Sequence, residues 1–90
     1  MKSTKLNLTK LFEEIPKDER VQTKLSFEIS NRIVSLMTHR GLTKSQFAAA
    51  IGCRPNEVTR WLSGEHNFTI RTIAAISAFF GAPIITVNNQ

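Results

Sequence analysis

Two short apolar patterns that meet at a glycine constrain the fold of this chain more than any other feature of its sequence. The first pattern begins at Thr43, because Thr43 and Gln46 have the spacing of a capping box, in which each side chain bonds the backbone N–H of the other residue. Gly52 is expected to end this helix, since glycine readily adopts the positive φ required just past a helix end. Pro55 suits the first turn of a second helix. That second helix is expected to bury Val58, Trp61 and Leu62.

Two short helices joined by a brief turn form the helix-turn-helix pattern, here over residues 43–62. Polar residues recur on the side of the second helix that faces away from its apolar residues. This outward face consists of Pro55, Asn56, Thr59, Arg60 and Ser63. A helix with such a face fits the major groove of DNA, with its N-terminal residues nearest the base edges. The spacing therefore predicts a DNA-binding motif.

Helices are also expected on both sides of this pair. The preceding helix is predicted to end near Gly41, and its start is open, because either Pro16 or Ser26 suits it. Its apolar stripe comprises Val21, Leu25, Ile29, Ile33, Leu36 and Met37. Thr69 is expected to cap the following helix, which Gly81 ends. The helical pattern of that segment comprises Ile70, Ile73, Ile76, Ser77 and Phe80.

The two ends of the chain lie outside this helical pattern. The β-branched residues at 84–87 predict a short strand or an extended tail, and residues 88–90 are expected to fray. Residues 1–24 are expected to form a partly helical extension in front of a domain at 25–87. Within that extension, Leu8, Leu11, Phe12 and Ile15 share one helical face. So short a helix is marginal in water, so this face is expected to pack either on the chain's own helices or on a partner protein.

Composition narrows the range of functions. The net charge of +5 favours an anionic partner, and nucleic acid is the first candidate. The single cysteine, Cys53, excludes an internal disulfide and a multi-cysteine zinc site, and no cofactor or metal is expected. No apolar run reaches the length of a membrane span, and no secretory signal is recognisable, so a cytoplasmic protein is expected. Catalytic motifs such as a nucleophile elbow or a phosphate-binding glycine loop are missing from the sequence, which argues against an enzyme.

Three stretches of the sequence resemble the XRE helix-turn-helix family of Cro and phage repressors. They are Gly41-Leu42-Thr43-Lys44-Ser45-Gln46-Phe47-Ala48, Ile51-Gly52, and Val58-Thr59-Arg60-Trp61-Leu62-Ser63-Gly64. The similarity covers residues 26–87. It implies an all-α, lambda-repressor-like bundle of about five helices that binds double-stranded DNA, usually as a homodimer that represses its own operon. The stretch at residues 61–70 is similar to a bacterial subgroup that includes antitoxins of the HigA type, which implies a toxin partner.

The resemblance also implies which residues contact DNA. Pro55, Asn56 and Arg60 correspond to the positions that contact bases, and the positions that contact phosphates correspond to Lys44, Arg54, Thr59 and Ser63. This sequence departs from the family pattern at three of these positions. Lys44 stands where glutamine is usual, Arg54 replaces a Ser or Thr cap, and Pro55 offers only apolar contact, for example to a thymine methyl group.

Two alternatives to the repressor hypothesis stay open. Pro55 and the missing cap at Arg54 are compatible with a protein-interaction module whose helix-turn-helix no longer reads DNA. A stand-alone phage-type repressor without a toxin would use the same chemistry. If the protein is a dimer, the expected contact surface is Phe79 together with the apolar tail at residues 84–87.

Overall fold

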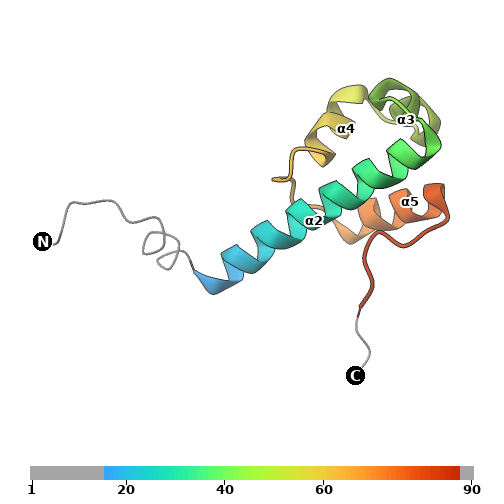
Figure 1. The fold of residues 1–90 in the computed structure, drawn as a ribbon. Helices are drawn as coiled ribbons and strands as arrows, with labels where there is room; N and C mark the ends of the chain where they lie inside the picture. Colours follow the sequence, from blue (N-terminus) through green and yellow to red (C-terminus); the bar gives the residue numbers. More distant parts are fainter. Residues whose placement is uncertain (1–15, 88–90) are drawn as a thin grey trace, which may run out of the picture.

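The computed structural model describes residues 16–87, which form an all-α structure (Figure 1). The helices are α2 (Lys17–Arg40), α3 (Lys44–Ile51), α4 (Pro55–Trp61) and α5 (Ile70–Phe80). The predicted fold class is therefore confirmed. The helix expected around Leu8, Leu11, Phe12 and Ile15 lies outside the described residues, as does the expected frayed end at 88–90.

The long helix α2 begins earlier than one of the two expected starts. Pro16 is its N-cap, with φ −54° and ψ 144°, and Asp18 and Glu19 in the first turn suit the positive end of the helix dipole. Ser26 is not a cap, because it lies buried in the middle of the helix. The division of the chain into residues 1–24 and 25–87 remains a prediction, and α2 runs unbroken across it.

Local capping sets the start of α3 and of α5 as the sequence predicts. The Thr43 hydroxyl accepts from the Gln46 backbone N–H at 3.1 Å, and the Gln46 side chain accepts from the Thr43 N–H at 2.9 Å. Thr69 caps α5 by accepting from the N–H of Thr72 at 3.1 Å. Gly52 ends α3 with φ 89°, a conformation that costs glycine little. These bonds satisfy backbone groups that have no partner inside a helix.

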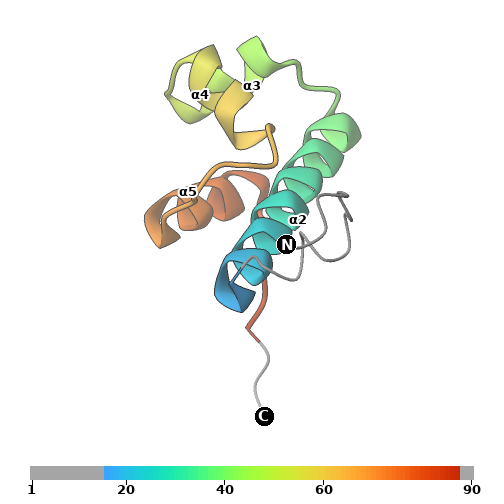
Figure 2. The same cartoon turned by 90° about the vertical axis from the view of Figure 1, so that its left-hand side faces the viewer.

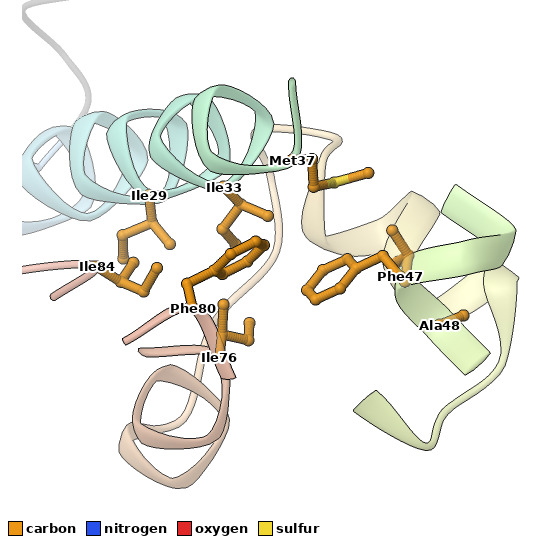
Figure 3. Close-up of a cluster of buried hydrophobic side chains, with 9 residues drawn as sticks. Ile29, Ile33, Met37, Phe47, Ala48, Ile76, Phe80 and Ile84 are labelled. Carbon is orange, nitrogen blue, oxygen red and sulfur yellow. The ribbon is translucent and has the colours of Figure 1, made fainter. Parts of the chain in front are cut away.

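The core forms where the four helices meet (Figure 3). Its centre is Phe47 of α3, which is fully buried. The Phe47 ring lies 5.9 Å from that of Trp61, 5.3 Å from that of Phe79 and 5.2 Å from that of Phe80, measured between ring centroids. One side chain of α3 therefore contacts both α4 and α5. Buried residues from the other elements complete the core: Ile29, Ile33, Met37, Val58, Ile76 and Ile84.

Not every residue of the apolar patterns is buried. Val21 and Leu25 belong to the stripe of α2 but are about half exposed, because the first turns of α2 extend past the other helices (Figure 2). Ile70 is 84% exposed. It opens α5, and at about 100° of rotation per residue it lies on a different side of the helix from Ile76. Phe79, expected on the surface, is half-buried against Phe47.

The segment after α5 is anchored by side chains. Of the two alternatives for residues 84–87, the extended tail forms and the strand does not, because no second strand of the described chain offers a partner. Instead, Arg32 of α2 donates from Nε to the Pro83 carbonyl at 3.1 Å, and the Ile84 N–H donates to the Ser77 hydroxyl at 3.2 Å. Ile84 itself is buried. Arg40 secures the end of α5 by donating to the Phe80 carbonyl at 2.7 Å, with its guanidinium 5.2 Å from the Phe80 ring centre.

Ser30 joins α2 to the end of α4. Its buried hydroxyl donates to the Trp61 carbonyl at 2.5 Å and accepts from the Gly64 N–H at 3.1 Å. The first bond satisfies a carbonyl in the last turn of α4, and the second holds the loop that follows. Phe27, one turn earlier on α2, leaves little room for a side chain at position 64, since a Cβ there would lie 3.0 Å from its ring. Ser30 therefore links the middle of α2 to the end of α4 and to the loop that follows it.

Replacing Ser30 with alanine should lower the free energy of unfolding by about 1–3 kcal/mol, because the buried Gly64 N–H loses its acceptor. Urea unfolding followed by circular dichroism measures the change. Ser35→Ala is the matched control, because Ser35 is an exposed serine in the same helix, and its effect should stay within about 0.5 kcal/mol. Equal effects of the two substitutions would contradict the role assigned to Ser30.

Candidate nucleic-acid interface

The helices α3 and α4 lie together at the end of the molecule away from the start of α2 (Figures 1 and 2). The connection between them is short. The N–H groups of both Gly52 and Cys53 donate to the Ala48 carbonyl at 2.9 Å, which closes the end of α3. Arg54, with φ −92° and ψ 150°, is then the N-cap of α4. This arrangement is the helix-turn-helix geometry that the spacing predicts.

The two faces of α4 differ as expected. Val58 is fully buried, and Trp61 packs against the core. The seven residues predicted to contact DNA are all exposed on α3, α4 and the adjoining turns: Lys44, Arg54, Pro55, Asn56, Thr59, Arg60 and Ser63. The structure therefore brings the predicted base-contacting and phosphate-contacting residues onto one accessible surface, which we call the α4 face.

Three side chains of the α4 face are available for a ligand. Within residues 16–87, Arg54, Asn56 and Arg60 make no side-chain hydrogen bond or ion pair. All three are exposed. Arg60 and Asn56 carry planar groups with donors arranged for bidentate bonds, the kind that discriminate guanine and adenine in the major groove.

Lys44 is brought to this face although it belongs to α3. Its ammonium group lies 3.4 Å from the Thr59 hydroxyl, which in turn donates to the Pro55 carbonyl at 3.2 Å. Lys44 and Thr59 are fifteen positions apart in the sequence. Their proximity gives α4 a cation beside its polar face, where a phosphate of the DNA backbone would approach.

The Ser63 hydroxyl makes two hydrogen bonds to backbone groups close to it in the chain. It donates to the Arg60 carbonyl at 2.8 Å and accepts from the Glu65 N–H at 3.1 Å. Both bonds stabilise the turn after α4. A phosphate contact would require the Ser63 hydroxyl proton to leave the Arg60 carbonyl, just as the Thr59 hydroxyl proton would have to leave the Pro55 carbonyl. Both hydroxyls therefore depend on local rearrangement more than Lys44 does.

The first turn of α4 contains two departures from the family pattern, Arg54 at the N-cap and Pro55 after it. Arg54 makes no side-chain capping bond, as expected. Pro55 at the first helical position lacks an N–H, so one of the four donors that lack a partner at a helix start is absent. The Glu57 N–H donates to the Arg54 carbonyl at 2.9 Å, so it has a partner without a side-chain cap. Proline at this position therefore offsets part of the missing cap.

Cys53 lies in the connection and is not activated. Burial raises the pKa of its thiol, and the neighbouring Glu57 carboxylate raises it further by repulsion and by hydrogen bonding. The thiol is consequently protonated at neutral pH. Nucleophilic or metal-binding chemistry requires the thiolate, so Cys53 acts as a small packing residue beside α4.

Sequence reasoning missed Ser30, which positions α4 from outside the motif. A signal existed, because Ser26 and Ser30 interrupt the apolar face of α2 one turn apart, where buried hydroxyls require partners. The sequence did not reveal that the partners of Ser30 are backbone groups at the end of α4. No His, Cys, Asp and Glu side chains of residues 16–87 cluster in a way that could hold a metal ion. None of the helices described is long and apolar enough to cross a membrane.

Comparison with known proteins agrees with this geometry. A helix-turn-helix family model matches residues 33–86, which include the second part of α2 and all of α3, α4 and α5. Neither the curated proteins nor the solved structures gave a significant match. The family match extends over more than half of the chain and includes every residue of the α4 face. The protein therefore belongs to the XRE-type helix-turn-helix family, whose domain implies DNA binding.

Proposed function

We propose that this protein is a transcriptional repressor that recognises a specific DNA sequence through α4. The observation that carries the proposal is the α4 face itself, on which exposed Asn56 and Arg60 have no partner among residues 16–87. Both project from a helix whose opposite side is anchored in the core by Val58. A rigid helix with unengaged, bidentate side chains suits direct readout in the major groove.

The roles divide between bases and backbone. Asn56 suits the N6 and N7 atoms of adenine, Arg60 suits the O6 and N7 atoms of guanine, and Pro55 offers apolar contact to a thymine methyl group. Lys44 and Arg54 lie beside this set and would contact phosphates directly, and Thr59 and Ser63 would do so after their hydroxyl protons leave backbone carbonyls. Residues 43–63 contain three basic residues, Lys44, Arg54 and Arg60, and one acidic residue, Glu57. This excess of positive charge attracts a polyanion such as DNA.

Two finer proposals build on DNA binding. The first is a homodimer that reads two half-sites, because one helix of seven residues buries too little surface for tight specific binding. The second is autoregulation of an operon that also encodes a toxin, with this chain as the antitoxin. Its support is the similarity of residues 61–70 to that subgroup, and the genes beside its own are the test.

The rival hypothesis is a protein-interaction module that does not read DNA. Pro55 and the uncapped Arg54 motivated it. In the structure, Pro55 occupies the helix position that proline favours, so neither feature disrupts α4. Selection of binding sites from a pool of random duplex DNA separates the two hypotheses, since an interaction module would enrich no sequence.

Asn56→Ala and Arg60→Ala should each weaken binding to the selected DNA site by about 1–3 kcal/mol and relax the sequence preference at one base pair. Arg60→Lys should lose most of the same discrimination, because an ammonium cannot form the bidentate pair. Fluorescence anisotropy with matched and single-substituted duplexes measures both effects. Asn31→Ala, at an exposed site on α2, is the control and should bind as the parent does. Unchanged preference in the Arg60 variants would contradict the role given to Arg60.

Lys44→Ala should weaken specific and non-specific DNA binding alike. The slope of log affinity against log salt should become shallower by about 0.9 for each phosphate contact that is lost. Titrations over a range of potassium chloride concentrations measure the slope. The control is Lys17→Ala, because Lys17 is an exposed lysine at the far end of the molecule. A slope that changes equally in both variants would show that Lys44 contributes only to net charge.

The dimer proposal predicts a two-to-one complex on DNA with half-sites about one helical turn apart. The dimer surface requires revision, since Phe79 and Ile84 are largely used by the core. Ile85 and Val87 remain exposed. Val87→Ser should therefore weaken dimerisation in sedimentation equilibrium while leaving the helical content unchanged. A monomer that protects a single, asymmetric half-site would rule the dimer out.

A further inference from the structure

The first turns of α2 carry apolar side chains that the described residues leave uncovered. Val21 is 51% exposed, Leu25 48% and Phe27 57%. Val21 and Phe27 both line one groove beside the helix, whereas Leu25 lies outside the groove lining. Exposed apolar groups that cluster in this way mark a surface that another segment covers, whereas apolar residues scattered singly do not.

A groove runs beside this surface, between the start of α2 and the loop between α4 and α5. Its volume is about 830 Å³. Val21 and Phe27 line it from α2, and Gly64 lines it from the loop. Because Gly64 has no side chain, the loop backbone closes directly over the Phe27 ring. Three cations border the groove, Lys17, Arg20 and Lys24, against one acidic residue, Glu65.

We propose that residues 8–15 of this same chain occupy the groove. The described chain begins at Pro16, one residue before the groove-lining Lys17. Pro16 has the extended backbone angles φ −54° and ψ 144°, so it does not continue the helix toward the N-terminus and allows the chain to turn back. The segment that ends at Ile15 therefore enters the structure at the mouth of the groove.

Length and spacing fit this occupant. From Lys17 to Phe27 the helix rises about 15 Å, and eight residues in helical form would extend about 12 Å, at about 1.5 Å per residue. Running back from Pro16, the segment would thus cover most of that length. Its apolar residues, Leu8, Leu11, Phe12 and Ile15, recur at helical spacing and match the apolar wall in kind.

The charges of the segment complement those along the groove when the segment runs back from Pro16. Glu13 and Glu14 lie closest to the turn at Pro16, where Lys17 and Arg20 border the groove. Lys10 lies farther from the turn and would approach the other end, near Glu65. A second copy of this chain would bring its own excess of cations to the same rim, which disfavours it. A tethered segment also loses less translational freedom on docking than a separate partner does.

A nitroxide label on the segment tests the proposal in the full-length chain. The label is attached at Thr9→Cys in a Cys53→Ser background, and the backbone amide signals are recorded by NMR. The amides of Gly64 and Glu65 should lose most of their intensity, whereas those of Gly41 and Gly52, near the opposite end of α2 and beyond it, should not. The matched control carries Leu8→Ser, Leu11→Ser and Phe12→Ser as well, and its Gly64 and Glu65 signals should recover.

Two outcomes would overturn the proposal. Equal intensities at Gly64 and Glu65 in the labelled chain and in its triple-serine control would show that the segment does not occupy the groove, which would leave it open to another protein. A mixture of isotope-labelled chain without nitroxide and unlabelled chain with nitroxide tests for a second copy. Loss of the Gly64 signal in that mixture would assign the groove to a neighbouring molecule.

Discussion

The packing of Phe47 is the constraint on which the rest of the structure depends. Its ring contacts Trp61 of α4 and both Phe79 and Phe80 of α5, so one side chain holds three helices together. Aromatic pairs at these separations add to the free energy gained by burying the rings. The orientation of α4 relative to the domain is consequently set from inside α3, and the α4 face is presented to solvent because Val58 and Trp61 are held on the other side.

Local chemistry accounts for what the sequence predicted well. The capping box at Thr43, the cap at Thr69 and the glycine after each of α2, α3 and α5 act within a few residues, so their sequence signals are sufficient to place helix ends. The α4 face was predictable for the same reason, because a short helix with one buried side must expose the other. The family match over residues 33–86 agrees with a helix-turn-helix at this place in the chain.

Errors arose where burial depends on distant parts of the chain. A periodic stripe shows that Val21 and Leu25 share a side of α2, but it does not show that the other helices end before reaching them. The composition of residues 84–87 left a strand and an extended tail open, and the extended tail forms because a strand requires a partner that the described residues do not supply. Ser30 was missed because its two partners lie more than thirty positions away. The loop that Ser30 holds also lines the groove beside α2, so one short segment ends α4 and borders a second surface.

The contact between Arg40 and Phe80 has a further electrostatic consequence. Arg40 is the last residue of α2, and the carbonyl that it binds belongs to the last residue of α5, so the negative ends of two helix macrodipoles meet at one place. Each end carries a partial charge of roughly −0.5, and their mutual repulsion would oppose this packing. The Arg40 guanidinium, bound to the Phe80 carbonyl, offsets this repulsion. The junction between the first and last described helices therefore depends on one positive charge, which a neutral side chain at position 40 would remove.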